Sequence, residues 1–197
     1  MKGLTGARAF YSKQMKWLVA AIFFVTLTGC NATVVGTAIQ GVIQGINQAR
    51  AATNQEYTLV WLSRHAQKQV SGGRDPELTI EGQKAAQNLA EQLSEVGIDA
   101  IYSTPFKRTV STAQPTANAK ELEIEQLMLS SKEMALKIQA MHLGQSILVL
   151  GHSNTTPELI AALGATEPVT IGHDQYGDLF LVVLKQGKFY QLHKFQY

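Results

Sequence analysis

The sequence predicts one α/β domain, a three-layer sandwich in which helices cover both faces of a mostly parallel central sheet. Short apolar runs alternate along the chain with segments of helical periodicity. Two of the apolar runs, within residues 59–66 and 146–154, end abruptly in polar sequence that contains a histidine. Strands buried in a parallel sheet have this continuous apolar pattern. The length of 197 residues suffices for one substantial core with additional sequence at one end.

The elements follow one another in a regular order. In the first half of the domain, we expect a strand at 57–62, a polar loop at 67–76, a helix from Thr79 toward Gly97, a strand at 98–102 and a helix through 108–113. An edge strand at 122–127 and a helix whose buried face carries Met134, Ile138 and Met141 should follow. The chain should end with a strand at 146–150, a helix from Pro157 to Gly164, and strands at 179–184 and 188–195.

Capping and turn residues mark several of these boundaries. Thr79 suits an N-cap and Gly97 a helix C-terminus, while Pro115 could kink the helix that contains it. Gln186-Gly187 between the last two strands indicates a hairpin.

The ligand crevice of such a domain lies beyond the carboxyl ends of its parallel strands. Arg64, His65, Thr104, Arg108 and His152 all follow predicted strands, so we expect them to gather there. Arginine forks bind phosphate oxygens, and a neutral imidazole can attack phosphorus. Neighbouring arginines would lower the pKa of such a histidine, and a second, protonated histidine would stabilise the developing charge. This chemistry requires no metal or cofactor, and two histidines without a carboxylate make a poor zinc site.

Four motifs carry a resemblance to a known family. They are Arg64-His65-Ala66, Leu78-Thr79-x-x-Gly82, Tyr102-Ser103-Thr104-Pro105-x-x-Arg108-Thr109-x-x-Thr112-Ala113 and Gly151-His152-Ser153-Asn154-Thr155. From about Tyr57 onward, the chain resembles the histidine phosphatase superfamily, also called phosphoglycerate mutase-like. The resemblance implies that His65 is the phosphate-accepting nucleophile, that Arg64 and Arg108 bind phosphate, and that His152 is the second pocket histidine.

The same motifs put Thr104, Ser153 and Asn154 among the substrate-binding residues. Three further histidines match no motif, and we expect them to be ordinary core or surface residues: His142, His173 and His193.

Two departures from the family pattern stand out. Ala66 replaces the usual glycine after the first histidine, and Ser153 follows His152 where some members place a general acid. Four acidic residues lie between Arg108 and His152, but none stands in a matching motif: Glu121, Glu123, Glu125 and Glu133. The chain therefore resembles the compact branch that includes phosphohistidine phosphatases, and its general acid is unassigned.

The N-terminal segment resembles a bacterial lipoprotein signal peptide, residues 1–29. An apolar stretch follows Lys13 and Lys16, is shorter than a bilayer span and ends in Leu27-Thr28-Gly29-Cys30. Translation could begin at Met15. We expect Cys30 to be lipidated, with several acyl chains for stable anchoring.

Residues 30–55 then form a tether, and residues 56–197 the phosphatase domain. The residue after the cysteine, Asn31, suggests the outer membrane of the envelope, with the domain facing the periplasm. Four of the 17 basic residues and none of the acidic residues precede Cys30. The rest of the chain therefore has 13 basic and 15 acidic residues and a net charge of about −2. A general nucleic-acid-binding surface is disfavoured.

The functional hypothesis is a lipid-anchored, metal-independent hydrolase of phosphomonoesters or phosphoramidates acting through phosphorylated His65. Its substrate would be a phosphorylated small molecule or phosphoprotein. One alternative is a phosphate-ligand binding lipoprotein with weak or no turnover. Another is an envelope lipoprotein that uses the fold only as a scaffold, for which Arg108 would be dispensable.

Overall fold

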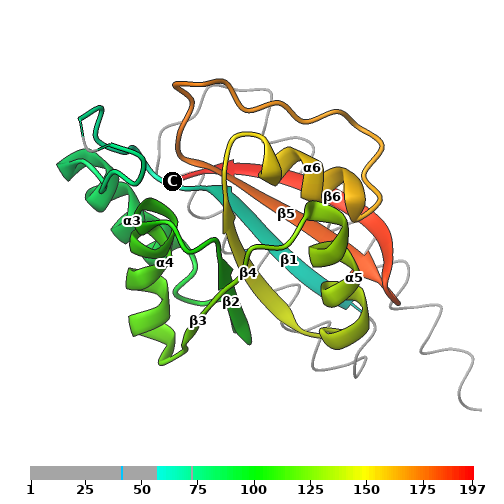
Figure 1. Cartoon of the computed structure of the whole chain (residues 1–197). Coiled ribbons are helices and arrows are strands. Elements are labelled where there is room, and N and C mark those ends of the chain that lie inside the picture. Colours follow the sequence, from blue (N-terminus) through cyan, green and yellow to red (C-terminus); the bar gives the residue numbers. More distant parts are fainter. Residues whose placement is uncertain (1–40, 42–56, 72) are drawn as a thin grey trace, which may run out of the picture. The chain divides into compact units, whose positions relative to one another are not determined.

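The computed structural model describes residues 41, 57–71 and 73–197. It contains a six-stranded sheet with the order β3-β2-β4-β1-β5-β6 (Figure 1). The strands are β1 (Tyr57–Arg64), β2 (Ala100–Ser103), β3 (Ile124–Gln126), β4 (Ser146–Gly151), β5 (Asp178–Lys185) and β6 (Lys188–Gln196). β1, β2, β3 and β4 run parallel, whereas β5 and β6 pair antiparallel. The predicted α/β class with a mainly parallel sheet is confirmed.

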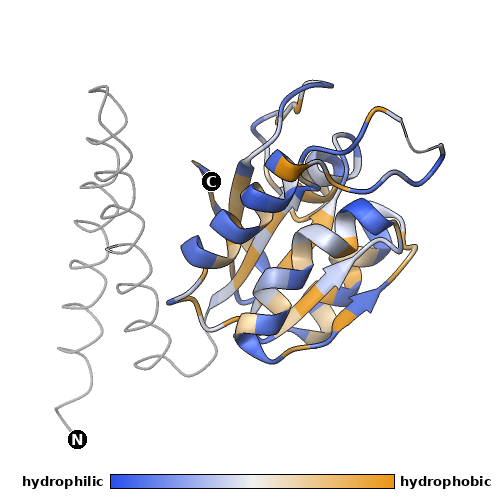
Figure 2. Cartoon of the chain, turned by 90° about the vertical axis from the view of Figure 1, so that its left-hand side faces the viewer, coloured by the Kyte–Doolittle hydropathy of each residue, from blue (hydrophilic) through white to orange (hydrophobic). Residues whose placement is uncertain are grey.

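Helices cover the two faces of this sheet in pairs. They are α3 (Ile80–Gln92), α4 (Lys107–Lys120), α5 (Ser131–Met141) and α6 (Thr155–Ala162). α3 packs on α4, and α5 packs on α6. The apolar strands lie between these layers, and the outward helix surfaces are largely hydrophilic (Figure 2). The arrangement is the expected three-layer sandwich.

Alternation along the strands divides the core between the two faces. Val60 and Leu62 of β1 and Val149 of β4 join α5 and α6 in one apolar cluster that also contains Phe180. The intervening residue Trp61 is also buried, at 1% exposed, so β1 is covered on both faces. The histidine-containing motifs at the ends of β1 and β4 therefore stand on fully buried strands.

Several boundaries differ from the sequence-based expectation. The helix expected to reach Gly97 ends at Gln92, because the chain turns at Leu93, although Thr79 does cap its start by accepting a hydrogen bond from the Gly82 amide (3.0 Å). α4 continues through Pro115. Met141 is 65% exposed, so its placement on the buried face of α5 was wrong.

Other boundaries agree with the expectation. β3 is an edge strand, and α6 stops before Gly164, whose φ is +105°. Gln186 and Gly187 both have positive φ in the hairpin between β5 and β6, as the turn geometry requires.

The predicted signal peptide, the lipidated Cys30 and most of the tether lie outside the described residues. Within the described part of the chain, no helix is both long and apolar enough to cross a membrane.

Candidate active site

β1 and β4 bring the two motif histidines together. The two strands pair in parallel with Arg64 opposite Gly151, and the His65 amide donates to the Gly151 carbonyl (2.9 Å). The imidazole rings of His65 and His152 consequently lie 5.5 Å apart, centre to centre. A Cβ on Gly151 would come within about 3 Å of the Thr155 and Thr156 hydroxyls, which explains the glycine before the second histidine.

The tautomer of His65 follows from its hydrogen bond. Its Nδ1 lies 2.7 Å from the Ala66 carbonyl oxygen. A carbonyl can only accept, so Nδ1 carries the proton and Nε2 of the neutral ring keeps a free lone pair. The Ala66 amide in turn donates to the Thr112 hydroxyl (2.9 Å), which donates to the Arg108 carbonyl (2.7 Å). Residue 66 thus contributes its backbone to orienting the His65 ring.

Burial keeps His65 neutral. Only 3% of the residue is exposed, and desolvation lowers its pKa from 6.5 to about 3, with the positive charges of Arg64 and Arg108 acting in the same direction. The sequence-based argument had the direction right but assigned it to the arginines, whereas burial is the larger cause. At neutral pH the Nε2 lone pair is therefore available for attack on phosphorus.

Arg64 performs a structural task that the motif did not indicate. Its Nη1 donates to the carbonyls of Gly172, His173 and Gln175 at 2.7–2.9 Å, and its guanidinium stacks on the Tyr176 ring at 4.2 Å. These contacts fasten the loop before β5 to the end of β1. Its Nη2 makes only a long contact, 3.4 Å, with the Tyr176 hydroxyl, and its Nε has no hydrogen-bond partner among the described residues.

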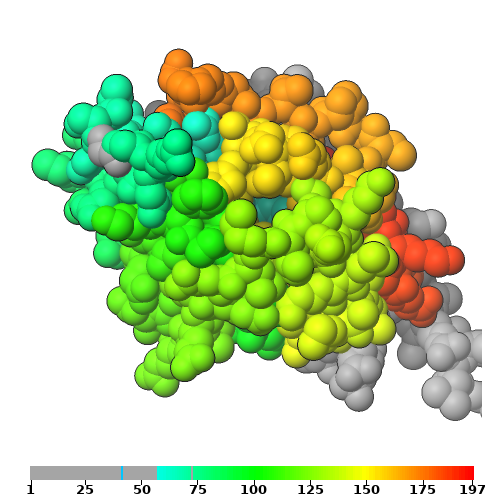
Figure 3. Space-filling view, viewed as in Figure 1, coloured from blue at the N-terminus to red at the C-terminus, as the bar shows by residue number. Residues whose placement is uncertain are grey.

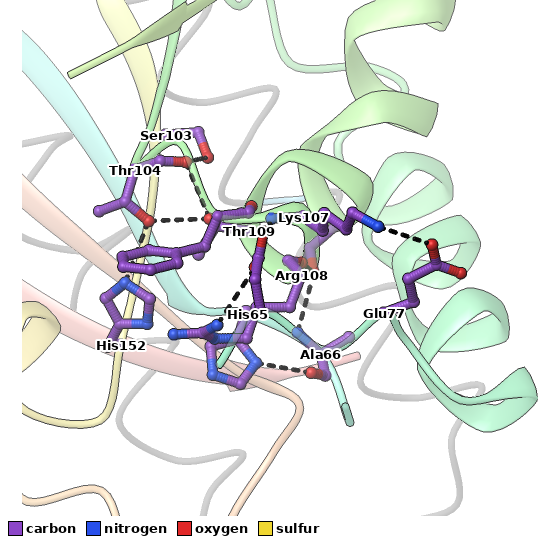
Figure 4. Close-up of polar contacts among 12 residues, drawn as sticks. His65, Ala66, Glu77, Ser103, Thr104, Lys107, Arg108, Thr109 and His152 are labelled. Carbon is purple, nitrogen blue, oxygen red and sulfur yellow. Dashed lines mark hydrogen bonds and ion pairs between the residues drawn. The ribbon is translucent and has the colours of Figure 1, made fainter. Parts of the chain in front are cut away.

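Arg108 enters the site from the first turn of α4. Its guanidinium lies 4.4 Å from the centre of the Phe106 ring and forms an ion pair with Asp75 (Nη1 to Oδ1, 3.5 Å). Asp75 also accepts a hydrogen bond from the Lys107 amide (3.0 Å). The side chains of Arg108, His65 and His152 converge on one another in Figure 4.

Each arginine has a buried Nε without a hydrogen-bond partner among the described residues. A buried guanidinium donor that stays unpaired is costly, because it loses hydration without compensation. An oxyanion that reaches these atoms would supply the missing acceptors. Phosphate matches this arrangement, since its oxygens accept several charge-assisted hydrogen bonds at once.

His152 is oriented by a chain of threonine hydroxyls. Thr109 donates to the Thr104 and Phe106 carbonyls (2.9 and 2.8 Å) and therefore accepts from the Thr104 hydroxyl (2.8 Å). Thr104 then has no proton left for His152, so His152 Nε2 (3.0 Å) must donate to it. Burial lowers the pKa of His152 to about 4, and Arg108 and Arg64 act in the same direction. Without a bound anion this ring is neutral at pH 7.

Ser153 and Asn154 lead from His152 into α6. Ser153 is half-buried and Asn154 is exposed. Their predicted role in substrate binding stays a prediction.

The acidic residues between Arg108 and His152 are engaged elsewhere or exposed. Glu125 pairs with Lys137 (3.1 Å), and Glu133 caps α5 through Ser130. Glu121 and Glu123 are exposed. The carboxylate in contact with the site is Asp75, which serves as the partner of Arg108. In the described residues, no group of three or more His, Cys, Asp or Glu side chains could hold a metal ion.

The three remaining histidines lie apart from this cluster. His142 is buried and bonds to the Tyr102 hydroxyl (2.7 Å) and to Gln145 (2.5 Å). The His173 side chain is 87% exposed, and His193 lies on β6. The expectation that they are core or surface residues agrees with these positions.

Sequence reasoning missed three residues of the site: Tyr176, Phe106 and Asp75. Tyr176 lies 6.1 Å from His65, ring centre to ring centre, and Phe106 lies 5.3 Å from His152. Phe106 occupies an unspecified position of a recognised motif, and the other two lie in loops whose paths no periodicity predicts. Their contacts could be found only in three dimensions.

Comparisons with known proteins agree with the motifs. Residues 60–129 match the model of the histidine phosphatase superfamily (branch 1), a range that includes Arg64, His65 and Arg108 but not His152. Phosphoserine phosphatase 1 of Hydrogenobacter thermophilus is 44% identical over 69 residues, which are 32% of this chain and 33% of that protein. The chain thus matches about a third of the length of this curated relative.

Solved structures share the fold. The protein histidine phosphatase SixA complexed with tungstate has a TM-score of 0.59 at 21% identity, over 68% of this chain and 95% of that one. A mycobacterial glucosyl-3-phosphoglycerate phosphatase has a TM-score of 0.59 at 13% identity, over 72% of this chain and 98% of that one. The family model over residues 60–129 agrees with the resemblance that the motifs indicate, and the solved structures show a shared fold.

Proposed function

We propose that this protein is a lipid-anchored phosphatase that hydrolyses a phosphomonoester or phosphoramidate through a phosphohistidine intermediate on His65. The observation that carries the proposal is a buried, neutral His65 whose Nδ1 is held by the Ala66 carbonyl, beside two arginines with unpaired Nε donors. The phosphatase names of the relatives point to the same class of reaction.

The reaction has two balanced steps. In the first, the Nε2 lone pair of His65 forms a bond to phosphorus, while the bond from phosphorus to the leaving atom breaks and its electrons pass to that atom, which takes up a proton. In the second, water attacks phosphorus and loses a proton, the bond from nitrogen to phosphorus breaks, and the lone pair returns to His65. Arg64 and Arg108 hold the charge on the phosphoryl oxygens, so neither step requires a metal ion.

The source of the leaving-group proton is the open part of this mechanism. Asp75 is paired with Arg108, and the four glutamates after Arg108 are exposed. A substrate whose leaving group departs readily needs little protonation. A phosphoramidate that arrives already protonated at its leaving amine or imidazole is such a substrate, because the departing group is then neutral, and this accords with the compact, phosphohistidine phosphatase-like branch.

Turnover of a small aryl phosphate by the purified full-length chain tests the proposal. We expect metal-independent hydrolysis that His65→Ala reduces to background, because the variant lacks the Nε2 lone pair that is proposed to attack phosphorus. Unchanged hydrolysis in that variant would refute the mechanism.

A phosphate-ligand binding lipoprotein with weak or no turnover is the second candidate. The carboxylate of Asp75 favours it, because the ion pair with Arg108 engages the acid that the described residues bring to the site. It predicts that inorganic phosphate binds in an Arg108-dependent manner while aryl phosphate is not hydrolysed.

The envelope location is part of the proposal and rests on the sequence from Lys13 to Asn31. Lipidation at Cys30 would place the domain at the periplasmic face of the outer membrane. Incorporation of labelled fatty acid into the chain, lost in Cys30→Ser, is the expected result; equal labelling of the variant would contradict lipidation at that residue.

A further inference from the structure

The loop that leads from α6 into β5 converges on Arg64. The carbonyl oxygens of Gly172, His173 and Gln175 all accept from one guanidinium nitrogen, Nη1, at 2.7–2.9 Å. Figure 3 shows this loop, in orange, on the surface along the top of the view. Surface loops are usually more mobile than the elements they connect. Three carbonyls therefore meet at one atom only where other contacts hold the loop in shape.

Gln175 holds the shape of the loop through two hydrogen bonds to Gly172. The Gln175 amide donates to the Gly172 carbonyl (3.1 Å), and the Gln175 side-chain oxygen Oε1 accepts from the Gly172 amide (3.1 Å). Together they close one turn, residues 172–175, whose first and last carbonyls both accept from Arg64. The side chain of Gln175 thus completes the turn that presents these carbonyls.

Asp178 fixes the orientation of the Gln175 side-chain amide. Gln175 Nε2 donates to the Asp178 carboxylate, which also accepts from Lys194 Nζ (3.1 Å). A carboxylate only accepts and a backbone amide only donates, so Gln175 must direct Nε2 at Asp178 and Oε1 at Gly172. The Asp178 carbonyl accepts from the Ser63 hydroxyl (2.8 Å), which ties this arrangement to β1.

The burial of the Asp178 carboxylate is costly. Asp178 is 2% exposed, and its Oδ1 has no hydrogen-bond partner among the described residues. The Lys194 side chain that pairs with Oδ2 is 48% exposed. A buried ion pair adds little net stability, because desolvation offsets the attraction. Stability alone therefore gives a poor account of this carboxylate, whereas the geometry that it imposes on the loop gives a specific one.

The direction of the Arg64 guanidinium follows from the loop. A guanidinium is planar and rigid. The three carbonyl contacts of Nη1 and the stacking on the Tyr176 ring at 4.2 Å therefore set the directions of all its N–H groups. One of these groups is Nε, which has no partner among the described residues. Its orientation is thus fixed before a phosphoryl group binds.

We propose that Gln175 and Asp178 are positioning residues for Arg64, because they hold the 172–175 turn whose carbonyls fix the guanidinium. The inference rests on the proposed function, in which Arg64 holds charge on the phosphoryl oxygens. Both residues act through the loop and Arg64. Donors that are already oriented stabilise a transition state without the cost of reorganisation.

Gln175→Glu tests the proposal with almost no change of shape. It sets a second carboxylate against Asp178, and the two repel each other. We expect kcat/KM of the full-length chain for aryl phosphate to fall by about 10²-fold, the loss that a displacement of about 1 Å can produce. Asp174→Asn serves as the control, since it changes the charge of the same loop by one unit at a side chain that is 92% exposed and pairs with His173. Its turnover should match that of the wild type.

A compensating substitution shows whether the hydrogen bond itself matters. Adding Asp178→Asn to Gln175→Glu reverses the polarity of the pair, because the introduced amide donates to the introduced carboxylate, which still accepts from the Gly172 amide. The net charge of the chain is then that of the wild type. We expect kcat/KM to recover most of its loss. A double variant that is folded by urea titration yet as impaired as Gln175→Glu would contradict the proposal.

A double-mutant cycle separates positioning from general damage to the loop. In an Arg64→Ala background, Gln175→Glu should lower kcat/KM by less than about twofold, because the group that it positions is absent. A loss by the same factor with and without Arg64 would overturn the inference.

Failure of this inference is distinguishable from failure of the proposed function. His65-dependent turnover that Gln175→Glu leaves unchanged would overturn the positioning role and leave the phosphatase proposal standing. Absence of His65-dependent turnover would overturn the proposed function and this inference with it.

Discussion

At the residue scale, Arg108 combines positioning with charge. Its guanidinium is fixed by Asp75 on one side and by the Phe106 ring on another, while its Nε stays unpaired. A donor held in this way loses little freedom when phosphate binds, so most of its interaction is available to the transition state. We expect Arg108 to act mainly through this fixed orientation.

Replacement of Arg108 tests that role. Arg108→Ala should lower kcat/KM for aryl phosphate by about 10²–10³-fold, the loss typical of one transition-state donor. Arg108→Lys should recover only part of it, because an ammonium cannot reproduce the fork. Lys107→Ala is the matched control, since the Lys107 side chain forms an exposed ion pair with Glu77 and the variant keeps the backbone amide that donates to Asp75. Equal losses in the Arg108→Ala and Lys107→Ala variants would mean that general charge, and not the fixed guanidinium, matters.

The motifs identified the central residues of the site but not all of their tasks. Arg64, His65, Arg108 and His152 do lie together. The three carbonyl contacts of Arg64 could not be predicted, because they come from a loop more than 100 residues later in the chain. The identity of the side chains indicates phosphate chemistry. Which nitrogen atoms of Arg64 bind the loop carbonyls, and which stay unpaired, depends on the tertiary structure.

At the element scale, the start of α3 fixes the loop that follows His65. Gly82 lies in the first turn of the helix, and a Cβ there would come within 2.1 Å of the Gln67 carbonyl oxygen. Thr79 donates to the Gln67 side-chain oxygen (2.9 Å), and its amide bonds to the Gln67 carbonyl (3.0 Å). The Leu-Thr-x-x-Gly motif thus fixes the position of the Gln67 backbone, which lies two residues beyond His65.

Gly82→Ala separates this contact from helix propensity. Alanine would stabilise an unobstructed helix position by about 1 kcal/mol. Because the Gln67 backbone must shift, we expect the free energy of unfolding to fall instead, by about 1–3 kcal/mol in urea titrations. Gln83→Ala, at the exposed neighbouring position, should change it little. A more stable Gly82→Ala variant would contradict the close approach.

Helix and strand order followed from periodicity, but element ends did not. The Gly97 signal was overridden because Leu93 and Val96 are buried in a turn after the helix, at 1% and 2% exposed. Met141 had the right spacing for the buried face of α5 but lies in its last turn, where the helix leaves the core. Local pattern gives the type of an element, and tertiary packing decides where it stops.

At the scale of the whole molecule, the buried His65 and the half-buried His152 couple the site to stability. The unfolded chain protonates them near pH 6.5, whereas the folded chain resists protonation until pH values of about 3 for His65 and about 4 for His152. Their contribution is present in full above pH 6.5 and is lost as the pH falls toward those values. The free energy of unfolding should therefore decrease below pH 6.5, by about 2 kcal/mol per histidine at pH 5.

Urea titrations between pH 7.5 and 5 measure this decrease. The double variant His65→Asn/His152→Asn removes both titrating groups, and its stability should change less with pH, whatever its absolute value. An identical pH dependence in the two proteins would show that these histidines are not neutral in the fold.

The central claim is that His65 accepts the phosphoryl group, and rapid-quench trapping tests it most directly. The full-length chain is mixed with aryl phosphate, quenched at alkaline pH, digested and analysed by mass spectrometry. We predict a phosphoryl group on His65 that forms before phosphate release and is absent from His65→Ala. Hydrolysis of the aryl phosphate with no phosphoryl group on the chain, or with one on another residue, would contradict the account.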